Sequence, residues 1–430
     1  MNAQALILPL LLSFVHCFTA PGFVHFAHFV LAHMALLGTP HCVTETLRLT
    51  QFHQVVHWTT PYAFMQRGRW ACQQVSQGLL DRLTMTLGVT GEVVVVLDDT
   101  LVKKWGKPFF GLGLYPDPTD KNPGAHKRRV WGHCWVVLAL LWESQTGQWV
   151  GFPLAALLFV PLARCATAWP FLTKIDLAER LLCGLRWPAT RLILVVDNLY
   201  AKAQLARLTL TPQPCVLVSR LRSNAALYLP PSPPPTLPCQ GRPRLRGPKV
   251  TAAQLYRRRS QRQVLTVHIY GKRVTIAAYV GVVIPSRRLG NAPIRVVIFP
   301  QRSGHKMTIF FSTDPTMTPV RLLELYAARF KIEDIFDELK TSGGFADGRP
   351  RRFPALKRHA TLCLVAYSLL RLLSVTLTGA EQIEAEPWWS PAGPPSVTRL
   401  RRAVFKSLHI SSRLHSAPKA KENLSLKEAA

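Results

Sequence analysis

The sequence predicts an α/β protein in which a mixed sheet is flanked by helices. Two continuous runs, Glu92 to Leu97 and residues 192–196, carry this prediction, and all their residues except Glu92 are apolar. Both are short and rich in β-branched residues, which is typical of strands buried on both faces. Each run leads directly into aspartate, at Asp98-Asp99 and at Asp197. Segments with helical patterning precede, separate and follow the runs, so helices should flank the sheet.

The patterning also divides the chain into parts. Residues 1–88 are mostly helical in pattern, and we expect a domain that either binds DNA or caps the core. The core itself should comprise residues 89–219 and 316–378, with a mostly β insertion at 220–315 between them. Residues 379–430 are rich in proline and then basic, which predicts a tail whose last part is disordered.

Residues 6–38 are strongly apolar and raise the question of a membrane span. Pro9, Pro21 and several histidines interrupt the run, and Met-Asn-Ala-Gln before it carries no positive side chain. The charged start of a signal peptide is therefore missing. We expect buried helices of the N-terminal domain here and no membrane partner.

The charge of the chain points to a polyanionic partner. Lys plus Arg number 53 and Asp plus Glu 23, for a formal net charge of +30. A folded protein this positive repels itself unless it meets a polyanion, and double-stranded DNA is the first candidate. Codon bias toward arginine is the alternative source of part of the excess.

The cysteines and histidines give no local metal motif. Nine cysteines are scattered along the chain without a C-x-x-C pair. This argues against a disulfide framework and against a zinc ribbon, and fits a reducing cytoplasm. His25, His28 and His133 lack further ligands at metal-binding spacing, so we interpret them as core or surface residues.

The remaining expected elements alternate between strand and helix patterns. An antiparallel pair at 130–143 and 148–153 should extend the sheet, and the segment 264–283 should form a hairpin that turns at 270–272. The other predicted elements are helices at 168–187 and 200–208, strands at 215–219, 295–300 and 307–312, and a helix at 360–378.

A helix over residues 326–340, entered near Thr318-Pro319, is the most informative of these elements. It contains no Pro or Gly, and Thr-Ser-Gly-Gly follows it. At 3.6 residues per turn four polar side chains share one face, namely Tyr326, Arg329, Glu333 and Lys340. An apolar face adjoins them and can pack on a sheet. The alternative is an ordinary amphipathic helix with i,i+4 ion pairs.

Two strand-end aspartates and a helical glutamate can jointly hold divalent cations. Hard oxygen ligands select Mg²⁺ or Mn²⁺, and two such ions promote phosphodiester displacement. A basic loop at residues 101–129 follows the first aspartates and should contact phosphates, although a solvated loop is also possible. The set predicts an enzyme of phosphoryl transfer on nucleic acid.

The spacing Tyr326-x2-Arg329-x3-Glu333-x6-Lys340 resembles the Y-R-E-K signature of a group of bacterial insertion-sequence transposases of the DDE type. The two strand ends and the β insertion match the layout of that family. The resemblance implies a ribonuclease H-like core in which Asp99, Asp197 and Glu333 bind two Mg²⁺ ions, with Mn²⁺ as a substitute. It also implies that Tyr326, Arg329 and Lys340 contact DNA phosphates near the element end.

Two ligand assignments have competitors. Asp99 is preferred to Asp98 because the family's aspartate directly precedes threonine, while alternation along a strand lets only one of the pair face the site. Asp337 shares the helix face of Glu333, and only the signature spacing favours Glu333.

Family members often hold a flipped base with an aromatic residue of the β insertion. No tryptophan lies between Trp187 and Trp388, which leaves other aromatic residues of the insertion as candidates. These candidates are Tyr270, Tyr279, Phe310 and Phe311.

The resemblance predicts a DNA transposase that cleaves strands at element ends and transfers them into target DNA. Such enzymes act as dimers or larger synaptic complexes on double-stranded DNA, and this one should work at the nucleoid of a bacterial cytoplasm. Two alternatives are a related endonuclease that does not transpose and a non-catalytic DNA-binding protein derived from a transposase.

Overall fold

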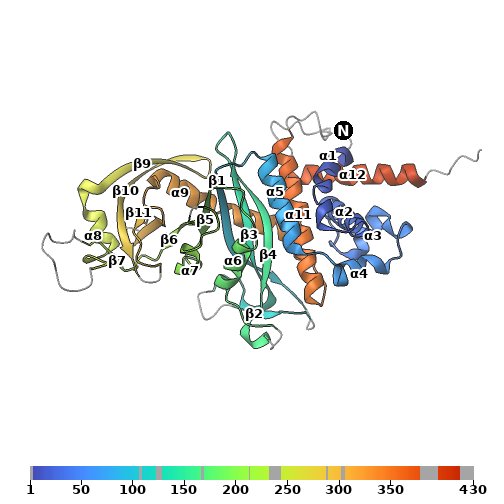
Figure 1. The fold of residues 1–430 in the computed structure, drawn as a ribbon, viewed down its shortest axis with the longest axis horizontal. Helices are drawn as coiled ribbons and strands as arrows, with labels where there is room; N and C mark the ends of the chain where they lie inside the picture. The colour runs from blue at the N-terminus through green and yellow to red at the C-terminus, as the bar shows by residue number, and fades with distance from the viewer. Residues whose placement is uncertain are drawn as a thin grey trace, which may run out of the picture.

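The helices of the N-terminal part, with α11 (Phe353–Thr376) and α12 (Val397–Ser416), gather at one end of the molecule, and the sheet extends from there to strands β9, β10 and β11 of residues 262–300 at the other end (Figure 1). The computed structural model describes residues 3–105, 109–122, 128–165, 169–212, 214–231, 244–286, 289–301, 306–377 and 396–416. Within these residues twelve strands join into one sheet. Helices pack on both faces, which confirms the prediction of a mixed α/β sheet flanked by helices.

The part of the sheet that carries the aspartates centres on β1 (Glu92–Lys103). On one side β1 pairs antiparallel with β3 (Arg129–Glu143), which pairs antiparallel with β4 (Trp149–Phe159). On its other side β1 pairs parallel with β5 (Arg191–Val196), followed by parallel β6 (Val216–Leu221). The predicted strands and antiparallel pair are therefore confirmed, although β1 continues through Asp98 and Asp99 instead of ending before them.

The β-rich segment after β6 extends the same sheet and does not form a sheet of its own. Strand β12 (Met307–Ser312) pairs antiparallel with β6, and β11 (Ile294–Pro300) and β10 (Lys272–Pro285) follow in order. Strand β9 (Arg262–Ile269) pairs with β10 as the predicted hairpin. Its turn holds Tyr270 at φ 52° and Gly271 at φ 70°, the left-handed pair of a tight hairpin turn.

Three short strands complete the sheet, namely β2 (Gly113–Pro116), β7 (Leu227–Tyr228) and β8 (Lys249–Val250). The other short elements are α8 (Ala252–Arg257) and 3₁₀ turns at Val15–Cys17, Phe52–Gln54, Leu162–Arg164 and Arg259–Gln261.

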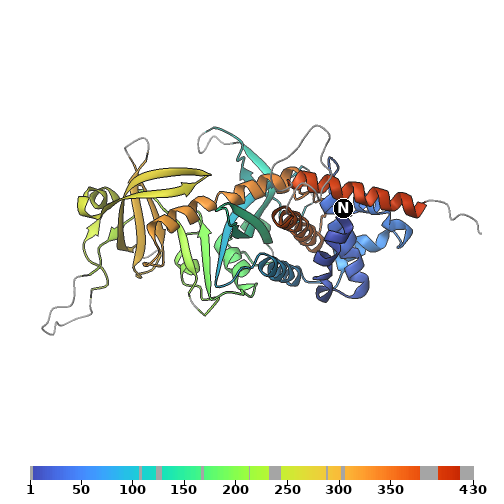
Figure 2. The ribbon, with the colours of Figure 1, turned by 90° about the horizontal axis from the view of Figure 1, so that it is seen from above.

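The expected single helix over 326–340 is divided into α9 (Pro319–Ala328) and α10 (Lys331–Thr341). Arg329 and Phe330 keep helical dihedral angles, but i→i−3 bonds replace the usual pattern there, as in the 3.0 Å bond from the Glu333 amide to the Phe330 carbonyl. The two helices still run nearly end to end across the sheet (Figure 2). A 3₁₀ stretch in mid-helix often marks a functional site.

Each face of β1 is buried in its own apolar core. Val94 and Val96 pack in the core that contains Ile332 and Ile335 of α10, whereas Val93, Val95 and Leu97 belong to the core beneath α5 (Cys72–Thr86). Successive residues of a strand point to opposite faces, so this division sets which face each following residue occupies.

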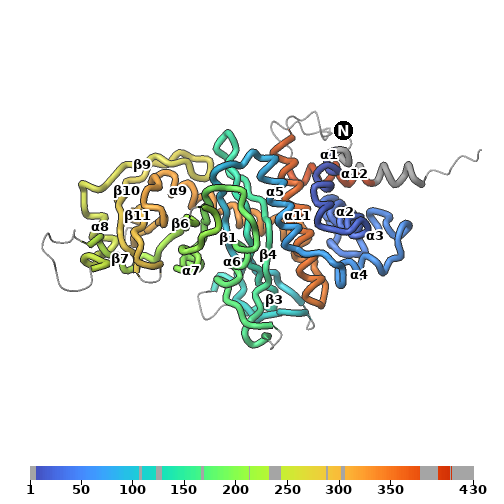
Figure 3. The backbone as a smooth tube through the Cα atoms, in the orientation of Figure 1, coloured from blue at the N-terminus to red at the C-terminus, as the bar shows by residue number. Residues whose placement is uncertain are grey.

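The N-terminal helices lie on the side of α11 (Phe353–Thr376) that faces away from the sheet (Figure 3). They are α1 (Ala3–Leu12), α2 (Ala20–Ala35), α3 (Val43–Thr50) and α4 (Thr59–Arg67). The apolar run at 6–38 is thus divided between α1 and α2, whose buried residues join the core. In the described part of the chain only α11 is long and apolar enough to cross a membrane, and most of its length is buried inside the protein.

Several predicted boundaries were wrong. The helix expected at 168–187 is only α6 (Lys174–Cys183), because the side chains of Thr173 and Asp176 form a capping box that begins it late. The helix expected at 200–208 is the single turn α7 (Ala203–Ala206).

The tail expected from residue 379 contains a helix, α12 (Val397–Ser416). Val397, Leu400 and Val404 are buried at helical spacing against the N-terminal helices, a pattern that the many arginines between them obscured. We expected disorder in the last residues of the tail. Residues 417–430 lie outside the described residues.

We expect Ile332→Ala to lower the free energy of unfolding by about 2–4 kcal/mol, because a fully buried side chain at the contact of α10 with the sheet is lost. Urea unfolding of the purified chain measures this. Asp334→Ala on the same helix is the control, since its pair with Lys331 is exposed and should contribute less than about 1 kcal/mol. Equal losses for both variants would show that α10 is not anchored through its apolar face.

Candidate active site

The structure brings Asp98 and Asp197 together on one face of the sheet. In the parallel register of β1 and β5, Leu97 lies opposite Val196, so the two aspartates follow at adjacent positions. Val96 of β1 and Val195 of β5 precede them by two residues and belong to the core of α10. By the alternation of side chains both aspartates face that helix.

Arg329 joins this pair to the helix. Its guanidinium donates to Asp98 Oδ2 at 2.9 Å and to Glu333 Oε1 at 3.1 Å. The Arg329 side chain is 12% exposed and that of Glu333 46%, so the carboxylate of Glu333 remains open to solvent on one side. Arg329 therefore joins Asp98 of β1 to Glu333 of α10, and Asp197 at the end of β5 lies beside Asp98.

Burial raises the pKa of Asp98 to about 7, and the neighbouring charge of Asp197 adds to the rise. The amide of Asp99 and the charge of Arg329 act in the opposite direction. Arg329 therefore compensates only part of the cost of placing two carboxylates side by side. Such a carboxyl is well suited to bind a further cation.

Asp197 is held from its own loop. Its Oδ1 accepts the amide of Leu199 at 2.8 Å and that of Tyr200 at 3.4 Å. These bonds fix the carboxylate directly after the strand, as in an Asx-type turn.

Asp99 points to the opposite face of the sheet, where its partners belong to other elements. Lys174 Nζ donates to Asp99 Oδ2 at 2.5 Å, and the Tyr200 hydroxyl donates to Asp99 Oδ1 at 2.9 Å. Cys134 Sγ lies 3.4 Å from the same carboxylate. Of the two adjacent aspartates, the structure therefore places Asp98, and not the expected Asp99, with Arg329 and Asp197. The order of side chains along β1, and not the threonine that follows, decides which aspartate meets Asp197.

The other signature residues are distributed along the two helices. The Tyr326 ring lies 4.6 Å from that of Phe310, and the Arg329 guanidinium carbon is 5.8 Å from the Tyr326 ring centroid. Lys340 lies farther along α10, where burial lowers its pKa, the charge of Asp337 raises it and the nearby Lys103 lowers it. The structure thus groups Tyr326, Arg329 and Glu333 and places Lys340 beside a second lysine.

Asp337, the competitor of Glu333, is exposed and lies with Lys340. Glu333, by contrast, is tied through Arg329 to Asp98. The geometry therefore favours Glu333 as the helical member of the acidic cluster.

Tyr270 was one of four aromatic candidates in the β segment, and the structure places it at the rim of this site. Its side chain is 68% exposed, and its ring is 5.8 Å from that of Phe330. Burial raises the pKa of its hydroxyl, the charge of Arg329 lowers this pKa, and the charge of Glu333 raises it. Tyr279 and Phe311 are fully buried, and Phe310 packs beneath Tyr326.

The basic loop after β1 has structural partners in its described part. Lys103 and Arg128 both pair with the buried Asp117. Lys104 Nζ donates to the carbonyls of Ala346 and Gly348, each at 2.6 Å. Lys107 and Lys127 lie outside the described residues. The predicted phosphate contacts of this loop therefore do not involve free Lys103 or Lys104 side chains.

The chain is thus an α/β protein with an acidic site. Two adjacent parallel strands supply aspartates to this site, and Arg329 and Glu333 join them from the helices. Residues 13–276 match the family model described as DDE superfamily endonuclease, which covers more than half of the chain. The chain belongs to this transposase-like family of DDE endonucleases. The match includes Asp98 and Asp197 and ends before Glu333. None of the curated proteins matches the chain.

The raised pKa of Asp98 predicts a pH-dependent stability in metal-free buffer. The unfolded carboxyl ionises near 3.9 and the folded one near 7, so this group destabilises the folded chain as pH rises through that interval. Asp98→Asn removes the titration. The free energy of unfolding of the variant should rise relative to that of the wild type by about 1–2 kcal/mol between pH 5 and pH 8. Urea unfolding with a chelator present measures both values.

Asp120→Asn is the control for this experiment. The amides of Asn122 and Arg128 lower the pKa of Asp120, so this carboxyl is ionised across the whole interval in both states. Its difference from wild type should stay constant between pH 5 and pH 8. A constant difference for Asp98→Asn as well would contradict the environment described for that residue.

Proposed function

We propose that the chain is a DNA transposase of the insertion-sequence group with the Y-R-E-K signature, built on a ribonuclease H-like core. The observation that carries the proposal is the pairing of Asp98 with Asp197 on adjacent strands, together with Arg329, which joins Asp98 to Glu333. The strand order β4-β3-β1-β5-β6, with β1, β5 and β6 parallel, supports the core assignment. In this proposal residues 89–219 and 316–378 form the core, 220–315 the β insertion and 1–88 a helical domain.

Asp98, Asp197 and Glu333 would hold two Mg²⁺ ions, with Mn²⁺ as a substitute. The donor set fits such ions because it consists of carboxylate oxygens. Burial and then the charge of Asp197 raise the pKa of Asp98, and a bound cation would favour its ionised form. When bound, divalent ions supply an activated oxygen nucleophile and stabilise the leaving oxygen in phosphodiester displacement.

The side chains of this site have separate tasks in the proposal. Arg329 orients Asp98 and Glu333, and its charge can be shared with a DNA phosphate that reaches the carboxylates. Tyr326 and Lys340 would contact the phosphates on either side of it. The apolar face of α10 fixes the height of Glu333 above the sheet.

The carboxylates are tested with DNA that carries the two chromosomal flanks of the coding gene as candidate element ends. Asp98→Asn, Asp197→Ala and Glu333→Gln should each lower Mg²⁺-dependent cleavage by about 10³-fold or more, because a ligand of the reacting metal is lost. Gel-shift binding of the same DNA should change little. Asp337→Asn, one turn beyond Glu333, should cleave within about threefold of wild type. Cleavage by Asp197→Ala at the wild-type rate would contradict the assignment of Asp197 as a metal ligand.

The choice of Asp98 over Asp99 has its own measurement, Mn²⁺ binding by calorimetry. Asp98→Asn should lose binding, whereas Asp99→Asn should retain it at a temperature where the variant is folded. Loss of the Asp99 charge leaves Lys174 without its partner, so a lower thermal stability is expected for that variant. Retained binding in Asp98→Asn together with loss in Asp99→Asn would restore Asp99 as the ligand.

We infer that Tyr270 stacks on a base displaced near the cleavage position. An exposed ring at the tip of a hairpin beside Phe330 supports this role. Tyr270→Ala should lower the rate of end cleavage by about 5- to 100-fold, the equivalent of one lost base–aromatic stack. Tyr270→Phe keeps the ring and should retain most activity. Equal losses in both variants would indicate a role for the hydroxyl instead.

Strand transfer and assembly are further parts of the proposal. We expect a dimer or larger complex on double-stranded DNA, acting at the nucleoid of a bacterial cytoplasm. Linked element ends and a target plasmid, incubated with the protein and Mg²⁺, should yield joined products. Cleavage without joining would support an endonuclease that does not transpose. Binding without cleavage would support a non-catalytic DNA-binding derivative.

A further inference from the structure

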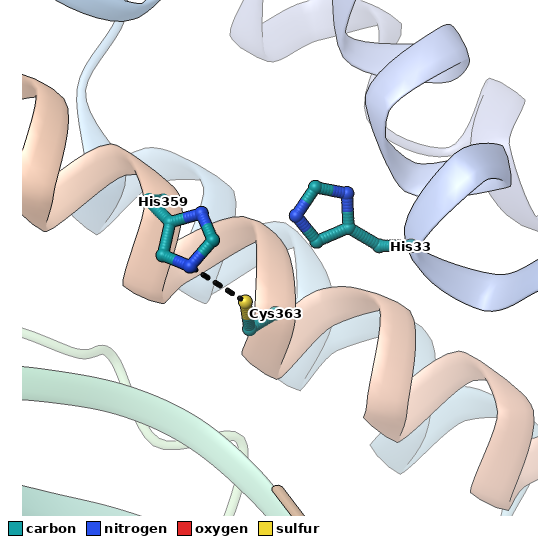
Figure 4. Close-up of side chains that lie close together, drawn as sticks. All are labelled: His33, His359 and Cys363. Carbon is teal, nitrogen blue, oxygen red and sulfur yellow. Dashed lines mark hydrogen bonds between the residues drawn. The ribbon is translucent and has the colours of Figure 1, made fainter. Parts of the chain in front are cut away.

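A second cluster of ligand-type side chains lies inside the protein, between the N-terminal helices and α11. His33 of α2 faces His359 and Cys363 of α11 (Figure 4). One ligand atom from each residue lies within 4.8 Å of the others, and all three side chains are buried. His33 is more than 300 positions away from His359 and Cys363 in the chain, so only the fold brings the three residues together.

The ring of His33 is fixed with a free nitrogen directed into this cluster. Its Nδ1 lies 2.8 Å from the Phe29 carbonyl, which can only accept, so Nδ1 carries the proton. Its Nε2 is then an acceptor, and it has no hydrogen-bond partner although the residue is 1% exposed. A buried polar atom without a partner is costly. A histidine whose other nitrogen donates to a backbone carbonyl is the usual arrangement of a metal ligand.

The two α11 residues lie at a spacing that suits tetrahedral coordination. Cys363 Sγ is 3.6 Å from His359 Nε2. With Zn–N near 2.05 Å and Zn–S near 2.3 Å, tetrahedral angles place these ligand atoms about 3.6 Å apart. The same Nε2 now lies 2.9 Å from the Gly344 carbonyl, so coordination would exchange that hydrogen bond for a bond to the metal.

His41 lies next to His33, outside the three ligand atoms that are within 4.8 Å of one another. Asp347 Oδ2 accepts from its ring Nδ1 at 3.1 Å and from its amide at 2.9 Å. Its Nε2 is buried without a partner, and its ring centroid is 5.3 Å from that of His33. A carboxylate behind a histidine is again the arrangement that orients metal ligands.

The glycines beside the cluster leave room for its rings. A Cβ on Gly344, which has φ +74°, would collide with the His41 ring, and a Cβ on Gly348 would lie 2.7 Å from His359 Cδ2. Both glycines belong to the segment between α10 and α11. This segment is therefore shaped around the histidines.

We propose that His33, His359 and Cys363 form a structural Zn²⁺ site, with the neighbouring His41 closing in as the fourth ligand when the metal binds. The combination of imidazole nitrogens and one thiolate is the donor set that Zn²⁺ prefers, and a closed set of four protein ligands is typical of structural sites. Binding forms the S–Zn bond as the Cys363 thiol loses its proton to solvent. Two cations lie close by, since Arg401 donates to the His33 carbonyl at 2.7 Å and Lys104 binds the Gly348 carbonyl.

The location of the proposed zinc site indicates which segments of the chain it would hold together. It joins α2 and the segment after it to α11, and through Asp347 to the segment that follows α10. Zn²⁺ would thus fasten the N-terminal helices to the part of the chain that carries Glu333. Its ligands are nitrogen and sulfur, whereas those of the acidic site are oxygen, so the two sites select different metals.

The test begins with the full-length wild-type chain produced in zinc-supplemented medium and dialysed against metal-free buffer. Plasma mass spectrometry should find about one zinc per chain, as expected for one closed site. Cys363→Ser and His33→Gln should lose most of it. Cys215→Ser is the matched control, because Cys215 is equally buried but lies in another part of the core. Asp98→Asn should also keep its zinc, which separates this site from the acidic one.

A second measurement covers variants that fold poorly. Wild-type protein stripped of metal and titrated with Co²⁺ should develop sulfur-to-cobalt charge-transfer absorption that saturates near one equivalent, and Zn²⁺ should displace it. Wild-type protein that holds no zinc and shows no such absorption with Co²⁺ would overturn the proposal. Zinc that persists in both Cys363→Ser and His33→Gln would do the same.

Discussion

The repulsion between Asp98 and Asp197 is the constraint around which the rest of this structure is arranged. Adjacent parallel strands place both carboxylates on one face at the same height. Burial and like charge raise the pKa of Asp98, and a single arginine offsets part of the cost. Such an arrangement is tolerated where function requires it, because a neutral pair would be more stable.

The elements around the pair can be understood from this constraint. Arg329 must reach Asp98 and Glu333 at once, and it sits at the 3₁₀ junction where α9 ends and α10 begins. The apolar side of α10 packs over β1 and holds that junction in place. The extension of the sheet through β12, β11 and β10 brings the hairpin turn with Tyr270 to the same place.

The buried cluster between α2 and α11 contains other types of side chain. There the buried groups are imidazoles and a thiol, their partners are backbone carbonyls and one carboxylate, and two ring nitrogens have no partner within the described structure. The α11 helix lies between the two parts, since it packs against β4 on one side and α2 on the other.

The amino-acid sequence by itself determined the class of fold and most of the acidic site. Continuous β-branched runs ending in aspartate identified β1 and β5, and the spacing from Tyr326 to Lys340 identified Arg329 and Glu333. These features are local, so they can be recognised without knowing what surrounds them. The sequence did not predict α12, because basic residues obscured its apolar spacing.

Only the tertiary structure decided between Asp98 and Asp99. Residues 93–97 are apolar on both faces of β1, so no polar pattern indicates which face meets the helix. That answer comes from the register with β5 and from the packing of α10, both of which join distant parts of the chain. The meeting of His33 with His359 and Cys363 was invisible for the same reason, since it depends on how α2 packs against α11.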